Sequence, residues 1–364
     1  MLGNFWYKKE KPLPTMIGMG GGATSLPNSG GAAAANFSGA IAFWGGGGGG
    51  GQRYSNTSFG GGGGFMKATC ELAPGDYTFI VGGHGDNYGG SVPAYGGGPE
   101  ADGNGGGGGG YSGLFEGDLT PYTFQGEPNA DPSSDRDTMF TKVIIITGGG
   151  GASGECPGPP AKGGGGGGGG GVGTPAPFPQ GTGVGAAGDP AKTSGYATYP
   201  AGGMGGGAPL TAGGAAAPDG GNAGSKLMGG FPGSGGGAGG GWYGGGSGGS
   251  CWGPDQELAA GGSAIMFPTY SSDVTLTATS GEMGYPGAHP TNHREAGGLS
   301  DPLCPGPTCG YGGASTGGGN DGAVVFGPIT AGSASVTPPG GSPSPVPASG
   351  QAFTSQGKYL LTIG

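Results

Sequence analysis

Short apolar runs, each leading directly into a block of glycines, recur along the chain. Residues 37–44 run into glycines 45–51, and residues 142–147, with an unbroken Val-Ile-Ile-Ile core, run into glycines 148–151. Runs of this length that are rich in β-branched and aromatic side chains are typical of strands rather than helices. The pattern therefore predicts β-strands that continue into glycine segments.

Alternation of apolar and polar positions predicts further strands. Residues 65–72 alternate, residues 77–81 form a second run, and the turn-forming pair Pro74-Gly75 lies between them. These two runs are predicted to form a β-hairpin over residues 65–81. The remaining strand candidates are two strands within 264–279, residues 323–326 and residues 358–363.

Helical patterns are almost absent. No segment shows a sustained apolar period of 3.6 residues, and each glycine costs a helix about 1 kcal/mol. The polar stretch 116–138 is predicted to be an exposed loop, and the Pro/Ser/Gly-rich stretch 331–352 a linker. The predicted fold class is mainly irregular and β, with almost no α-helix. We expect an arm at 1–36, a glycine-rich domain at 37–330, and a linker with a C-terminal strand at 331–364.

Composition narrows the choice between an ordered and a disordered chain. Of 364 residues 107 are glycine and only 9% are charged, against an average of about 7% glycine and about 25% charged residues. Such a composition often marks disorder. Disordered chains, however, are poor in aromatic and β-branched residues, whereas this one has 9% aromatics and several strand-like runs. Collagen is excluded because it requires glycine at every third position.

Blocks of consecutive glycines favour one particular packed structure. A left-handed helix of the polyproline-II type has three residues per turn and no internal hydrogen bonds, so its N–H and C=O groups point outward. Such helices can hydrogen-bond to neighbours on every side, if no Cβ keeps the backbones apart. Glycines 45–51 would form a rod of about 22 Å and glycines 163–171 one of about 28 Å. We predict a bundle of these polyglycine-II helices, with aromatics such as Trp44, Tyr111 and Trp242 covering its sides.

Charge and cysteine usage exclude several classes of partner. The net charge is −10, and the only basic cluster is Lys8, Lys9 and Lys11, so no nucleic-acid partner is expected. No apolar run approaches the roughly 18 residues of a membrane span, and none follows the basic N-terminus. We therefore expect neither membrane insertion nor a secretory signal. The five cysteines are expected to be mostly free, although Cys304 and Cys309 could close a small loop.

Patterns that would indicate catalysis or metal binding are weak. No glycine block is followed by the Lys-Ser/Thr pair of a phosphate-binding loop. His289 and His293 have the spacing of metal ligands on a helix, but the intervening Pro290 indicates a loop. Residues 83–87 and 319–322 are similar to calcium-binding repeats, which require several stacked copies. We expect no enzyme activity, no cofactor and no metal.

The order of the glycine-flanked motifs resembles that of a known domain. The motifs are residues 45–51, 74–82, 105–115, 143–151, 239–246 and 321–326. Over roughly residues 37–327, this order resembles the glycine-rich domain of bacteriophage virion proteins, including tail fibres and adhesins. It is also similar to the extracellular glycine-rich domain of the anaplastic lymphoma receptor kinases. In both families the glycine blocks form packed polyglycine-II helices. The receptors also have a signal peptide, a membrane span and a kinase domain, so the phage family is the better match.

The resemblance implies a virion structural protein that is made in the host cytoplasm. It would be a tail-fibre, spike or capsid-decoration component used in attachment to the host surface. Phe5, Trp6 and Tyr7 on the N-terminal arm are the expected anchor to other virion proteins. Phage fibres are commonly homotrimers, although no coiled-coil heptad supports a trimer in this chain.

Surface contact would come from loops between the glycine helices. By analogy with the phage family these are residues 85–104, 116–138 and 281–310, which would meet a host glycan or protein. The candidate contact residues in or near them are Tyr88, Tyr95, Tyr122, His289 and His293. Two alternatives stay open. One is a non-viral extracellular matrix or cell-surface glycine-rich protein. The other is a polysaccharide depolymerase, for which no acid/base pair is identifiable.

Overall fold

The structure is a computed structural model of the chain and divides it into two units, Met1–Ala33 and Ala34–Gly364. The first unit lies outside the residues that the structure describes. The described residues are 35–51, 59–87, 89–101, 105–123, 132–154, 182–183, 212–217, 220–232, 235–249, 259–267, 269–285, 294–314 and 317–364.

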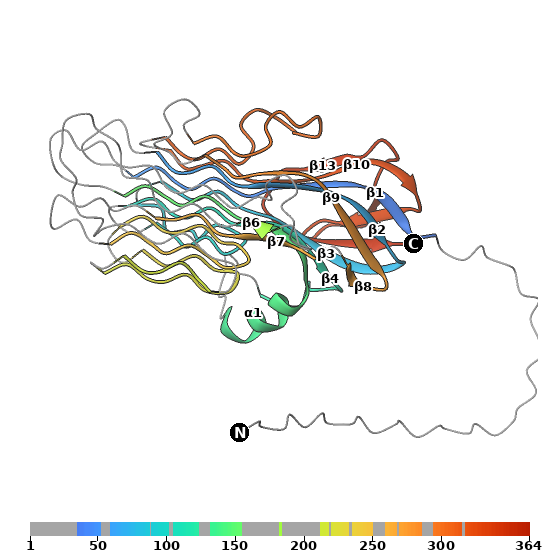
Figure 1. Cartoon of the computed structure of the whole chain (residues 1–364), viewed down its shortest axis with the longest axis horizontal. Coiled ribbons are helices and arrows are strands. Elements are labelled where there is room, and N and C mark those ends of the chain that lie inside the picture. Colours follow the sequence, from blue (N-terminus) through green and yellow to red (C-terminus); the bar gives the residue numbers. More distant parts are fainter. Residues whose placement is uncertain are drawn as a thin grey trace, which may run out of the picture. The chain divides into compact units, whose positions relative to one another are not determined.

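The second unit contains two antiparallel sheets (Figure 1). The first sheet has the order β13 (Gln351–Phe353), β10 (Ala323–Ala331), β1 (Phe37–Trp44), β2 (Phe65–Leu72), β9 (Val274–Glu282) and β8 (Thr269–Ser271). The second has the order β12 (Ser344–Pro345), β11 (Ala334–Thr337), β14 (Gly357–Ile363), β3 (Gly75–Val81), β4 (Ser112–Glu116), β5 (Val143–Thr147), β7 (Ala264–Met266) and β6 (Thr182–Gly183). The predicted class, mainly β and irregular with almost no helix, is confirmed.

A shared hydrophobic core joins the two sheets face to face. The ring of Phe79 in β3 lies 5.6 Å from that of Phe326 in β10 and stacks on Tyr359 of β14 at 4.9 Å. Ile41 of β1 and Ile145 of β5 belong to the same buried cluster. The apolar runs seen in the sequence therefore form strands because their side chains fill the space between the sheets.

The predicted hairpin over residues 65–81 is wrong. Both strands exist, but β2 belongs to the first sheet and β3 to the second. Both edges of β2 are already paired, one with β1 and the other with β9, so no edge is left for β3. The turn at Pro74 and Gly75 therefore carries the chain from one sheet to the other.

One helix, α1 (Pro132–Thr141), begins within the stretch 116–138 that the sequence predicts as an exposed loop and ends three residues beyond it. The ring of Phe140 stacks on Trp242 at 3.7 Å, and Met139 is buried. The N–H of Thr123 donates to the first-turn carboxylate of Asp135 at 3.0 Å. Tertiary packing therefore stabilises a helix whose own sequence lacks an apolar stripe.

The predicted linker at 331–352 is also wrong, because it contributes strands to both sheets. β11 and β12 lie at the edge of the second sheet, and β13 lies at the edge of the first. Val336 and Val346 are buried in the core between the sheets. The C-terminal strand candidate is confirmed as β14, which pairs with both β11 and β3.

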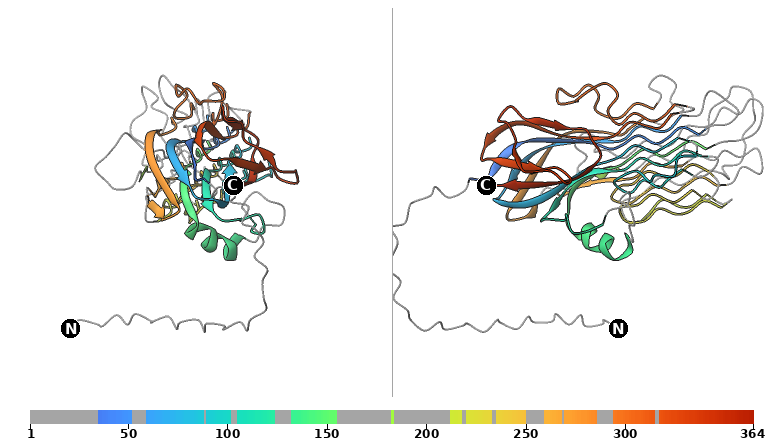
Figure 2. Two further views of the ribbon diagram at one scale, coloured as in Figure 1. Left: turned by 90° about the vertical axis from the view of Figure 1, so that its right-hand side faces the viewer. Right: turned by 180° about the vertical axis from the view of Figure 1, so that it is seen from behind.

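Beyond the sheets the strands continue as glycine segments that lie side by side (Figures 1 and 2). The N–H groups of residues 45–50 follow a three-residue period. The N–H groups of Gly45 and Gly48 donate to the carbonyls of Gly64 and Gly61, in one neighbouring segment. Those of Gly46 and Gly49 donate to Gly110 and Gly107 in a second segment, and those of Gly47 and Gly50 donate to Asn320 and Gly317 in a third. A period of three is that of the polyproline-II helix. The predicted polyglycine-II packing is thus present in this segment.

The carbonyl groups of the same segment bind three further neighbours. Gly46 accepts a hydrogen bond from Gly150, Gly47 from Gly85, and Gly48 from Gly313. Residues 45–50 are therefore surrounded by six other segments, three bonded through N–H groups and three through carbonyls. This arrangement satisfies the buried backbone groups without a sheet or a helix. The glycines at 163–171 lie outside the described residues.

Candidate functional site

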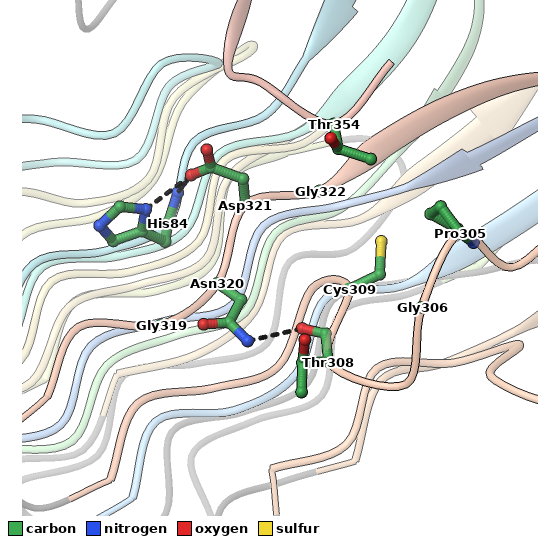
Figure 3. Close-up of a pocket in the computed structure, with 10 residues that line it drawn as sticks. All are labelled: His84, Pro305, Gly306, Thr308, Cys309, Gly319, Asn320, Asp321, Gly322 and Thr354. Atoms are coloured by element: carbon green, nitrogen blue, oxygen red, sulfur yellow. Dashed lines mark hydrogen bonds and ion pairs between the residues drawn. The ribbon is translucent and has the colours of Figure 1, made fainter. Parts of the chain in front are cut away.

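A pocket of about 430 Å³ lies where the glycine bundle meets the sheets (Figure 3). His84 follows the end of β3 by three residues, and Asp321 precedes the start of β10 by two. These strands belong to different sheets, and both continue into the bundle at the same end. The remaining walls are the turn 305–309, residues 319–322 and Thr354.

His84 and Asp321 form a hydrogen-bonded pair at one wall of the pocket. The backbone N–H of His84 donates to Asp321 Oδ1 at 3.0 Å, and the ring Nδ1 lies 2.6 Å from the same oxygen. The bond to Asp321 raises the pKa of His84; the charges of Asp321 and Asp86 act in the same direction, and partial burial opposes them. The two side chains are 36% and 26% exposed, so the pair is accessible to solvent.

The opposite wall of the pocket is a turn that packs against aromatic side chains of the first sheet. Lys67 of β2 binds both carboxylate oxygens of Asp301, at 3.1 and 3.0 Å, and so holds the segment that leads into this turn. Leu303, Cys304 and Cys309 then pack against the cluster that contains the buried residue Trp44. The wall is therefore fixed to the first sheet by an ion pair and by apolar contact.

The cysteine at the pocket is poorly suited to nucleophilic chemistry. Burial raises the pKa of the Cys309 thiol, and nearby Cys304 and Asp321 raise it further. The reactive form of cysteine is the thiolate, so a raised pKa keeps Cys309 inert. Cys70, Cys304 and Cys309 are free thiols, as expected, while Cys156 and Cys251 lie outside the described residues.

The aromatic residues that were expected to cover the bundle take two different places. Trp44 and Tyr111 are fully buried. Trp242 is half-buried and lies under α1, where it meets Phe140 face to face and the ring of Phe267 edge-on at 5.6 Å. This cluster fixes the helix against the bundle rather than offering an open ring face to a ligand.

The predicted contact residues fall partly outside the described part of the chain. Phe5, Trp6, Tyr7, Tyr88, His289 and His293 all lie outside it. Tyr95 and Tyr122 are half-buried and pack against the cluster beneath α1. Their carbonyls accept hydrogen bonds from Gly83 N–H and from Lys358 Nζ. Their role in surface contact stays a prediction.

Two of the three predicted contact loops are partly built into the scaffold. In the loop 85–104, the carbonyls of Gly96 and Pro99 accept hydrogen bonds from Tyr111 and Gly108 of the neighbouring glycine segment. In the loop 281–310, Gly297 donates to Gly63 at 3.0 Å. The described parts of both loops are therefore integral to the bundle.

The pocket was not found from the sequence. His84 and Asp321 are 237 positions apart, and the sequence marks the segments that hold them only by a similarity to calcium-binding repeats. The fold brings these two segments together, since Gly319 donates to the carbonyl of Gly85 at 2.9 Å. Within the described residues no group of three His, Cys, Asp or Glu side chains is arranged to hold a metal ion.

Comparison with family models, with curated proteins and with solved structures finds no match for this chain. None of the helices in the described part of the chain has the length and apolar character needed to span a bilayer. Function must therefore be argued from the scaffold and the pocket.

Proposed function

We propose that this protein is a structural component of a phage virion, in a tail fibre, a spike or a capsid decoration, that displays loops for attachment to the host surface. The observation that supports it is the glycine bundle, in which residues 45–50 bond to six neighbouring segments. Adding a Cβ to Gly46, Gly47 or Gly48 would bring it closer than 3.0 Å to a neighbouring backbone. Segments packed this closely form a rigid support.

A rigid support suits attachment because it holds a contact surface in place without catalysis. Preorganised loops bind with a smaller loss of conformational entropy than flexible ones. The glycine segments leave the sheets at one end, so the connections between them can vary while the lattice stays the same. The resemblance to phage virion domains, carried by the order of the glycine motifs, supports the same role.

Immunogold electron microscopy of intact phage particles tests this proposal. Antibody against this protein is compared with antibody against the major capsid protein as a positive control and with pre-immune serum as a negative control. Label at fibre tips indicates attachment, and label over the capsid indicates decoration. Particles that bind the capsid antibody but not this one contradict the proposal, and label on cell debris favours a cell-surface glycine-rich protein.

A competition assay tests the attachment role separately. Purified protein added to host cells before infection is expected to reduce phage adsorption in proportion to its concentration. Boiled protein is the matched control, because unfolding destroys the lattice that positions the loops. Normal adsorption at saturating protein, with virion label present, would limit the role to architecture.

A further inference from the structure

The pocket beside His84 and Asp321 holds polar groups that the protein itself does not use. Both hydrogen bonds to the Asp321 carboxylate within the described residues end on Oδ1, which leaves Oδ2 available. The hydroxyls of Thr308 and Thr354 make no hydrogen bond to another residue in the described part of the chain. Asn320 donates through Nδ2 to the carbonyl of Thr308 at 2.7 Å, and its Oδ1 is likewise unused.

These groups come from separate parts of the chain and surround one space (Figure 3). Asn320 and Asp321 follow a glycine segment, Thr308 lies in the turn 305–309, and Thr354 lies between β13 and β14. Thr308 and Thr354 are exposed, while Asn320 and Asp321 are half-buried. The pocket is thus open to solvent, and its polar groups are fixed by different elements of the fold.

The charge of the lining indicates what kind of ligand fits. Among the described residues that line the pocket there is no Lys or Arg, so this lining lacks the groups that hold an anion. Asp321 is the only carboxylate among the described lining residues, and His84 Nδ1 lies 2.6 Å from one of its oxygens. Divalent cations such as Ca²⁺ require several oxygen ligands and more negative charge than this pair offers. The lining is therefore suited to an uncharged polar molecule.

We propose that this pocket binds a neutral monosaccharide unit. A carboxylate oxygen accepts hydrogen bonds from sugar hydroxyls, and threonine hydroxyls and an amide oxygen can serve the remaining ones. The ring of Pro305 offers an apolar surface beside these groups. A volume of about 430 Å³ lies within the usual range of about 300–1,000 Å³ for small-molecule sites.

This inference does not rest on the virion proposal. It concerns the described residues around Asp321, whereas the virion proposal concerns particle location and the display of loops. Sugar binding can be tested on the purified chain alone. Its failure would leave the immunogold result unaffected, and a negative immunogold result would leave the sugar measurement unaffected.

Saturation-transfer NMR on the full chain tests the proposal. The probes are D-glucose, D-galactose, D-mannose and N-acetyl-D-glucosamine, with N-acetylneuraminic acid as the anionic comparison. We expect transfer to at least one neutral sugar and a weaker signal from the anionic one. Absence of transfer to all four neutral sugars, or preferential binding of the anionic one, would overturn the proposal.

Variants then locate the binding. Asp321→Asn keeps an oxygen for His84 and removes the free carboxylate oxygen, and Thr308→Val with Thr354→Val removes both hydroxyls at constant shape. Each is expected to weaken binding about tenfold or more, because each removes direct hydrogen bonds. The matched control, Thr275→Val with Thr277→Val, removes two exposed hydroxyls from β9, outside the pocket.

Thermal melting of each variant identifies any loss of fold. Unchanged affinity in both site variants, or an equal loss in the folded β9 control, would overturn the assignment. If Asp321→Asn fails to fold, the threonine pair still decides the question, because its hydroxyls make no contact that the described structure needs.

Discussion

At the scale of single residues, the missing side chains of the glycine segments determine the packing. A Cβ built on Gly48 would come closer than 3.0 Å to the carbonyl of Gly151 in the adjacent segment. By contrast, a Cβ on Gly306 would meet nothing within 4 Å. The close approach of a neighbouring backbone therefore requires glycine at position 48 but not at position 306.

Gly48→Ala is expected to lower the free energy of unfolding by about 3 kcal/mol, because the new methyl group must displace a neighbouring backbone. Urea denaturation of the full chain measures the change. Gly306→Ala is the matched control and is expected to leave stability unchanged or raise it by up to about 1 kcal/mol, since alanine restricts the unfolded chain. Equal effects at the two positions would contradict the lattice.

The His84–Asp321 pair predicts a dependence of stability on pH. Because the folded state raises the pKa of His84, its protonated form binds Asp321 more strongly than it binds solvent. The stabilisation is fully present below the unfolded pKa of about 6.5 and is lost as pH rises through the folded pKa. The pair is partly exposed, so the effect is small.

Comparison of the wild type with His84→Gln at about pH 5.5 and about pH 9 measures this contribution. At the lower pH the wild type is expected to melt at a higher temperature than His84→Gln. At the higher pH the difference in melting temperature between the two proteins should shrink. A difference that grows with pH would show that His84 stabilises the fold as a neutral ring.

At the scale of elements, strands could be predicted but their partners could not. The apolar runs that become β1, β5 and β14 can be recognised as strands from their composition and their apolar–polar alternation. Whether β2 pairs with β3 or with β9 depends on which edges are already occupied, and no local pattern carries that information. The helix α1 was missed because its stability comes from contact with Trp242 and not from its own periodicity.

Phe140→Ala is expected to release α1 from the bundle. The substitution removes the stack on Trp242 and the contact of Lys226 Nζ with the ring at 5.0 Å. We expect a loss of about 1–3 kcal/mol and faster amide exchange in residues 132–141. Asp137→Ala, which removes an exposed ion pair with the same lysine, should leave the unfolding midpoint almost unchanged. Equal effects would show that charge, not ring packing, holds the helix.

At the scale of the whole molecule, sequence reasoning identified the scaffold but not the pocket. Blocks of glycine admit few ordered structures, so the three-residue helix follows from composition and from backbone chemistry. The pocket depends on the meeting of His84 with Asp321, which only the complete fold brings about. The lattice joins described glycine segments that are far apart in the sequence, from residues 45–50 to residues 317–320, so we expect it to form and unfold as one unit.

Amide hydrogen exchange in the glycine segments tests the central claim most directly. If residues 45–50 bond to six neighbours, their N–H groups should exchange as slowly as those of β1. Gly340 and Ser342, which are exposed, provide the fast reference within the same chain. Slow exchange throughout residues 45–50, 60–64 and 106–110 is the expected result. Exchange of these glycines at the rate of Gly340 and Ser342 would contradict the packed polyglycine bundle.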